Sequence, residues 1–213
     1  MLKIIHEDNN SIVVFKPAGL ATQTASMGQK DLVSEVKNHL ASQNKRPYVA
    51  LINRLDQPVK GLVLMATNEK AAGEFSKMLS EGKIGKYYRA VVYGHMKEAE
   101  GRLEDFLIKD GRSNTSRVSD RSDPAAKKAI LEYKVIGSDE STQTLDIHLI
   151  TGRHHQIRVQ LSNAGCPILG DVKYGTEGSK AYGREQNISE TELTAYKLIL
   201  DSPGKKTCYS LDM

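Results

Sequence analysis

The stretch 50–65 constrains the fold more than any other part of this 213-residue chain. It consists of two apolar runs of strand character, separated by a polar segment that carries Asp56. Aspartate is a poor strand residue and is costly to desolvate among apolar side chains. Because Pro58 and Gly61 follow, we expect Asp56 to lie where one strand ends and a turn begins. Arg54 shares a face with it in an extended segment. Asp56 is therefore a structural ion-pair partner, a turn-capping aspartate, or a catalytic carboxylate beside a cation.

Composition limits the classes of protein that the chain can belong to. Its net charge of +4, from 30 Lys and Arg against 26 Asp and Glu, permits a polyanionic partner without proving one. No apolar run reaches the ~18 residues of a membrane span, and the first residues lack a signal-peptide layout. We therefore expect a soluble, cytoplasmic protein with no membrane partner. Two cysteines, Cys166 and Cys208, form neither a disulfide framework nor a metal cluster.

The hydrophobic periodicity predicts one domain in which strands outnumber three helices. Asp31 and Asn68 are candidate N-caps for two amphipathic helices, the first ending near residue 42 and the second at Gly82. The third helix is expected at 153–161, and 176–192 is expected to be a polar surface loop. The predicted strands include a hairpin of 2–6 with 12–15 and a closing pair at 193–200 and 207–211.

The segment 83–94 alternates with a period of two. This places Tyr88, Ala90 and Val92 on one face and Tyr87 with Arg89 on the other. Tyrosines interleaved with basic residues on a strand suit a nucleic acid, because cations meet phosphates and rings stack on bases. An ordinary half-buried strand produces the same pattern.

A polar excursion at 109–128 is also basic, with six basic residues against three acidic ones. It is either a flexible arm that lies against a phosphate backbone or an ordinary solvated loop.

A strand through Ile150 is expected to turn at residues 151–152 into the helical segment 153–161. His154 and His155 would point in different directions on a helix, and no carboxylate stands at a zinc-protease spacing, so no metal site is expected. Two arginines, an amide and an imidazole at a strand-to-helix turn predict an anion site.

These segments together resemble the RluA family of RNA pseudouridine synthases, over essentially the whole chain. Asn53 stands where the family usually has histidine, and Val59-Lys60 replaces its usual Thr-Ser. The resemblance is carried by five motifs in the right order: Arg54-Leu55-Asp56, Lys86-Tyr87-Tyr88-Arg89-Ala90, Gly152-Arg153-His154-His155-Gln156-Ile157-Arg158, Leu169-Gly170-Asp171 and Tyr174-Gly175.

The resemblance implies an α+β pseudouridine synthase fold, with a mixed, mainly antiparallel β-sheet flanked by helices and a central basic cleft. It implies a single catalytic domain over 1–213 without a separate N-terminal RNA-binding domain. The expected partner is RNA, either ribosomal or transfer RNA, with no cofactor, no metal and no obligatory protein partner.

The resemblance also implies the reaction, in which uracil within RNA is detached from its ribose, turned and rejoined through carbon-5. Asp56 is expected to be the nucleophile, attacking either the pyrimidine ring or the anomeric carbon. Arg158 is expected to pair with Asp56, Tyr88 to stack on the uracil, and Arg54 to fill the space left by the flipped nucleotide. The remaining residues expected to contact RNA are Asn53, Lys86, Arg153, His155, Gln156 and Leu169.

The residues are also compatible with two other functions. Asn53 and Lys60 depart from the family pattern, which favours a non-catalytic RNA-binding module or chaperone of the same fold. A nucleoside hydrolase using Asp56 at the anomeric carbon would release free uracil instead.

Overall fold

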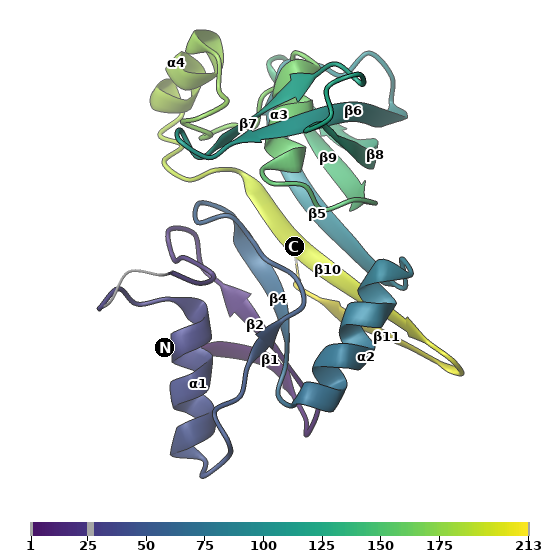
Figure 1. Ribbon diagram of the computed structural model, residues 1–213. Helices are drawn as coiled ribbons and strands as arrows, with labels where there is room; N and C mark the ends of the chain where they lie inside the picture. Colours follow the sequence, from purple (N-terminus) through teal and green to yellow (C-terminus); the bar gives the residue numbers. More distant parts are fainter. Residues whose placement is uncertain (1, 25–27, 213) are drawn as a thin grey trace. The chain divides into compact units, whose positions relative to one another are not determined.

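The computed structural model describes residues 2–24 and 28–212 (Figure 1). The chain divides into two compact units, which we call unit 1 (Met1–Gly85 with Ala195–Met213) and unit 2 (Lys86–Thr194). That residues 1–213 act as one catalytic domain stays a prediction. In the described part of the chain, no helix is long and apolar enough to cross a membrane.

Unit 1 is built on antiparallel strands covered by two helices. Strand β2 pairs with β1 on one side and β4 on the other, β3 pairs with β4, and β10 pairs with β11. The predicted hairpin of β1 and β2 is confirmed, and Asp8 closes its turn by accepting hydrogen bonds from the Asn10 and Ser11 amides. The elements are β1 (Lys3–Glu7), β2 (Ser11–Lys16), α1 (Leu32–Ser42), β3 (Ala50–Leu51), β4 (Lys60–Ala66), α2 (Glu69–Ser80), β10 (Leu193–Ser202, entering from unit 2) and β11 (Lys205–Ser210).

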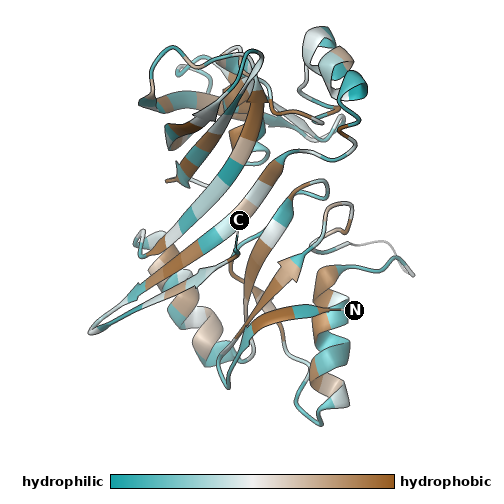
Figure 2. Cartoon of the chain, turned by 180° about the vertical axis from the view of Figure 1, so that it is seen from behind, coloured by the Kyte–Doolittle hydropathy of each residue, from teal (hydrophilic) through white to brown (hydrophobic). Residues whose placement is uncertain are grey.

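The two helices of unit 1 begin where the sequence predicts. The Asp31 carboxylate accepts a hydrogen bond from the Ser34 amide at 2.7 Å, and the Asn68 side chain accepts one from the Ala71 amide at 2.9 Å. These caps satisfy amides that have no partner within a helix. Figure 2 shows hydrophobic and hydrophilic residues alternating along α1, whose four buried residues are Leu32, Val33, Val36 and Leu40.

Unit 2 is an antiparallel sheet in the order β5-β9-β8-β6-β7. Helix α3 packs against β6 and β7. The elements are β5 (Ile84–Tyr93, beginning in unit 1), β6 (Glu100–Asp110), β7 (Thr115–Ser119), β8 (Lys127–Ser138), β9 (Thr142–Leu149), α3 (Gln156–Asn163) and α4 (Glu177–Glu185). The predicted α+β class with mainly antiparallel strands is confirmed, and the central basic cleft stays a prediction.

Two predictions about the loops are wrong. Residues 176–192 contain helix α4, which Thr176 caps by accepting a hydrogen bond from the Ser179 amide at 3.2 Å, so the described chain has four helices. The basic excursion 109–128 is not a free arm, because β7 within it pairs with β6 through residues such as Lys109 and Ser116.

Candidate active site

The loop that carries Asp56 is less extended than the sequence predicts. Strand β3 already ends at Leu51, and Asp56 instead begins a turn in which its carbonyl accepts a hydrogen bond from the Val59 amide at 3.0 Å. The buried Thr22 hydroxyl donates to the Leu55 carbonyl at 2.7 Å and accepts from the Leu55 amide at 3.3 Å. These bonds anchor the residue immediately before Asp56, so the loop is held in place without a strand.

Asn53 explains how the chain leaves β3 without losing its connection to β4. Its side-chain amide donates to the Leu62 carbonyl at 3.1 Å and accepts from the Leu64 amide at 2.7 Å, and the residue is buried. The amide thus replaces backbone pairing that a longer β3 would supply. The structure uses the Asn53 side chain within the fold, and its predicted contact with RNA stays a prediction.

Gly61 follows the Asp56 turn at the start of β4 and has a φ of 132°. A Cβ atom there would lie 2.3 Å from the Ala195 carbonyl oxygen of β10, a distance that no side chain tolerates. Glycine is therefore required at this position of the motif, both for its backbone angle and for the close approach of β10.

Lys16, which was not among the predicted site residues, lies at the end of β2 and is fully buried. Its ammonium group donates to the carbonyl oxygens of Pro17, Leu20 and Gln57 at 2.9, 2.7 and 3.0 Å. Burial lowers the pKa of Lys16 to about 8, and the nearby negative charge of Asp56 acts in the opposite direction. No alternation in the sequence marks its burial, because β2 is buried on both faces from Ser11 to Val14.

In unit 2, the predicted alternation of β5 is confirmed. Tyr88, Ala90 and Val92 are buried, whereas the residues between them are partly exposed. On the opposite face, Tyr87 stacks on His148 of β9, with ring centroids 4.6 Å apart and planes 9° from parallel. Tyr88 is thus held within the packed face of the sheet, with 5% of its surface exposed.

The two histidines before α3 contradict the sequence prediction, because their rings face each other. The ring centroids of His154 and His155 are 3.7 Å apart and the planes are 24° from parallel. The prediction assumed a helix from residue 153, but α3 begins at Gln156 and His155 has the left-handed φ of 54°. His155 also makes a 2.7 Å hydrogen bond with the Tyr174 hydroxyl, and His154 makes one of 2.9 Å with Ser116.

Gln156 fixes the turn that precedes α3. Its side-chain oxygen accepts hydrogen bonds from the Thr151 hydroxyl at 2.7 Å and the Arg153 amide at 2.9 Å, while its nitrogen donates to the Ile130 carbonyl at 3.0 Å. The amide predicted to contact RNA therefore already joins three segments of unit 2, and its contact with RNA stays a prediction.

Arg158 has a carboxylate partner that the sequence analysis did not assign. Its Nε and one terminal nitrogen donate to the two oxygens of Asp171 at 2.7 and 2.8 Å, and both side chains are buried. Asp171 also accepts hydrogen bonds from the amides of Lys173 and Tyr174. The pair is a two-point, charge-assisted contact that sets the orientation of the guanidinium. Pairing of Arg158 with Asp56, which lies in unit 1, stays a prediction.

Positive charge gathers near Gly152. Lys86 is buried on the same face of β5 as Tyr88, and a Cβ atom on Gly152 would lie 3.6 Å from its ammonium nitrogen. The pKa of Lys86 is lowered by burial and, secondarily, by the charge of Arg153. Arg153 itself is exposed, and its Nε donates to the Lys128 carbonyl at 2.9 Å. The predicted anion site thus has two cations close together.

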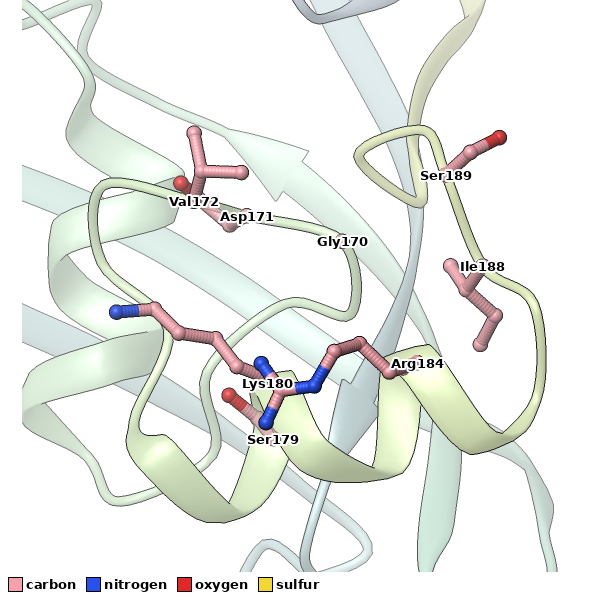
Figure 3. A pocket seen from close by; sticks show the side chains of 9 residues that line it. Gly170, Asp171, Val172, Ser179, Lys180, Arg184, Ile188 and Ser189 are labelled. Carbon is pink, nitrogen blue, oxygen red and sulfur yellow. The ribbon is translucent and has the colours of Figure 1, made fainter.

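The turn after α3 is equally constrained. Leu169 is buried and its amide donates to the Val91 carbonyl of β5, while Gly170 has a φ of 72° and lies against the Glu190 carbonyl. A hollow of about 220 Å³ lies beside this turn. Figure 3 shows the side chains that line it, with Val172 on the loop and Lys180 and Arg184 on α4.

The structure therefore distributes the predicted site over the two units. Unit 1 places Asn53, Arg54 and Asp56 on one loop, with Arg54 exposed and Asp56 partly buried. Unit 2 holds the rest of the predicted set: Lys86, Tyr88, Arg153, His155, Gln156, Arg158 and Leu169.

Comparison with known proteins identifies relatives over most of the chain. Residues 10–163 match the family described as RNA pseudouridylate synthase. Ribosomal large subunit pseudouridine synthase C of Rickettsia bellii is 35% identical over 197 residues, which cover 92% of this chain and 64% of the relative. Dual-specificity RNA pseudouridine synthase RluA of Vibrio parahaemolyticus is 29% identical over 91% of this chain and 77% of its own length.

Solved structures show the same fold. Human RNA Pseudouridylate Synthase Domain Containing 4 superposes with a TM-score of 0.81 at 24% identity, covering 99% of this chain and 88% of that one. The chain spans about two thirds of the length, or less, of the first curated relatives that it matches. The chain belongs to the RNA pseudouridylate synthase family, and its predicted resemblance to the RluA family is confirmed.

Proposed function

We propose that this protein converts a uridine within RNA to pseudouridine, with Asp56 as the nucleophile. The observation that carries the proposal is the Asp56 loop, where the family motif lies on an anchored turn beside a buried cation. In this reaction the bond between the anomeric carbon and N1 of uracil breaks, and a bond between the same carbon and carbon-5 forms. Carbon-5 loses a proton and N1 gains one, so no electron or group is imported.

Asp56 has the chemistry that this step needs. A carboxylate can attack either the pyrimidine ring or the anomeric carbon and later leave as the same carboxylate. A carboxylate facing a polyanion is electrostatically unfavourable unless a cation lies close by. Lys16 supplies such a cation from within unit 1, because its ammonium donates to three neutral carbonyl groups and its charge still acts on Asp56.

The unit 2 residues are proposed to bind and orient the nucleotide. Tyr88 stacks on the uracil, and Lys86 and Arg153 attract the phosphates on either side of it. The arginine of the Asp56 loop, Arg54, is exposed and takes the space left when the base is extruded. Extrusion costs a few kcal/mol, which a planar cation able to stack and bind phosphate offsets in part.

We further propose that the substrate is ribosomal RNA, and that the protein works in the cytoplasm without an obligatory protein partner. Several relatives that are about one third identical to this chain over the aligned residues are named for the ribosomal large subunit. One relative is named as dual-specificity, so transfer RNA is the alternative substrate. Mapping pseudouridines in total RNA with and without this gene distinguishes the two.

The decisive test uses RNA labelled with tritium at carbon-5 of uracil, because the reaction releases that tritium. We expect Asp56→Asn to slow release at least about a thousandfold, as removal of a nucleophile does. The matched control is Asp201→Asn, which removes an exposed carboxylate of the same unit and should leave the rate unchanged.

Other outcomes point to other functions. Tritium release by Asp56→Asn at the wild-type rate would exclude the proposed role of Asp56. Free uracil as product would identify a nucleoside hydrolase. RNA binding by the wild-type protein with no pseudouridine formed would favour a non-catalytic RNA-binding module.

A further inference from the structure

We propose that a basic pocket in unit 2 binds a backbone phosphate of the RNA through Lys109, Lys127 and Arg153. The inference rests on the proposed function in taking RNA as the ligand. It adds a contact outside Tyr88 and Arg158, neither of which lines this pocket. The two basic stretches that the sequence analysis treated separately, 109–128 and the turn before α3, meet here.

The pocket is a cavity of about 370 Å³ between β6, β7, the start of β8 and the turn before α3. Strand pairing brings its walls together, since Lys109 of β6 lies opposite Ser116 of β7 and Leu107 lies opposite Lys127 of β8. A cavity of this size has room for roughly a dozen water molecules, which exceeds what one inorganic phosphate fills. It can therefore hold a phosphate together with part of its sugar.

Charge in the pocket has one sign. Lys109, Lys127 and Arg153 line it, and no carboxylate does. In the described part of the chain, none of these three cations forms a salt bridge. Three cations held near one another without a counter-ion repel, so the pocket favours an anion.

The neighbouring lysine shows that this arrangement is not a general property of the surface. Lys128 follows Lys127 on β8, and successive strand residues point to opposite faces. Lys128 pairs with Glu104, whereas Lys127 lines the pocket. The two adjacent lysines thus face different surroundings. Lys128 faces a carboxylate on one side of the sheet, and Lys127 faces a pocket without a carboxylate on the other.

Hydrogen bonds hold the pocket wall in shape. The Ser116 hydroxyl makes a 2.9 Å hydrogen bond with Nδ1 of His154, and the Ser116 amide donates to the Tyr174 hydroxyl at 2.8 Å. Arg153 is tied to β8 through the Lys128 carbonyl. The cations are therefore presented from a fixed frame, as a site that recognises one phosphodiester requires.

The test measures RNA affinity as a function of salt. The site variant Lys109→Gln/Lys127→Gln is compared with the control Lys97→Gln/Lys134→Gln, which removes two exposed lysines of unit 2 that lie outside the pocket. All four lysines are exposed, so both variants should fold. We expect the site variant to bind a structured ribosomal RNA fragment about tenfold more weakly at low salt. Its slope of log K against log salt should fall by about one, as loss of one phosphate contact predicts.

The outcomes separate this inference from the proposed function. If both double variants change equally in RNA affinity and in the slope of log K against log salt, the pocket is not a phosphate site, even if pseudouridine forms normally. A selective loss in the site variant would support the pocket, even if the wild-type protein releases no tritium from RNA. If the site variant binds more weakly but turns over saturating RNA at the wild-type rate, the pocket contributes binding and not chemistry.

Discussion

The two units hold their buried cations in opposite ways. The ammonium group of Lys16 in unit 1 donates hydrogen bonds to three backbone carbonyls. These acceptors are neutral, so they do not cancel its positive charge. Arg158 of unit 2 is matched by Asp171 through two short hydrogen bonds, so that pair is close to neutral. Both side chains are almost completely buried.

The difference teaches what each cation can do. A charge solvated by neutral dipoles still acts on groups nearby, which is why Asp56 influences the pKa of Lys16. An arginine bound to a carboxylate has mainly a structural role, and here it joins α3 to the turn at Asp171. We therefore interpret Lys16 as an electrostatic element of the site and the Arg158–Asp171 pair as one that also holds the structure together.

The largest expected effect comes from breaking the charged pair. Asp171→Asn removes the buried carboxylate that two nitrogens of the Arg158 guanidinium bond, which should lower the free energy of unfolding by about 3–5 kcal/mol. Urea denaturation followed by circular dichroism measures it. The control is Glu177→Gln, whose partner Lys180 is on the surface and whose loss should change stability by less than about 1 kcal/mol. If both variants lose less than about 1 kcal/mol of unfolding free energy, the Arg158–Asp171 pair does not have the structural role assigned to it.

A smaller effect is expected from titrating Lys16, whose pKa in the folded protein is lowered from 10.5 to about 8 by burial. Above pH 8 the folded protein holds one proton fewer on this group than the unfolded chain, so stability should rise with pH. The rise should continue up to pH 10.5, at up to about 1.4 kcal/mol per pH unit. Because other groups also titrate in this range, the measurement is the difference in unfolding free energy between wild type and Lys16→Met. A difference that stays flat between pH 8 and 10.5 would show that Lys16 keeps its ordinary pKa and would end the contrast with Arg158.

The smallest expected effect concerns the neutral hydrogen bonds that anchor the Asp56 loop. Thr22→Val keeps the side-chain shape but removes both contacts with Leu55, which should cost about 1–2 kcal/mol of stability. We also expect slower tritium release, since Leu55 adjoins the proposed nucleophile. Thr207→Val on β11 is the control, because that side chain makes no hydrogen bond in the described structure. If both variants behave alike, Thr22 does not position the loop.

Local signals in the sequence predicted much of the fold. The caps at Asp31 and Asn68 are confirmed because a capping side chain bonds an amide only three residues away. The alternation of β5 is confirmed because successive side chains of a strand point to opposite faces, and only one face of β5 is fully buried. Helix α4 was missed because its residues are mostly polar and include Gly178 and Gly183, so no apolar stripe marks it.

The partners of polar side chains were harder to predict. Asn53 bonds β4, Arg158 bonds Asp171, and Lys16 bonds three carbonyls, one of them on Gln57. No periodic pattern in the sequence indicates which hydrogen-bond partners these three side chains have. Each depends on which backbone groups the folded chain brings within hydrogen-bonding distance, and several partners are distant along the chain.

By itself, the sequence determined the family, the order of the motifs and most of the strands and helices, because these depend on short patterns of side chains. Only the tertiary structure decided that Lys16 lies buried beside Asp56, that Arg158 is bound to Asp171, and that two separate basic stretches line one pocket. The physical reason is that burial and charge pairing are properties of neighbours in space, and strand pairing sets those neighbours only when the chain has folded.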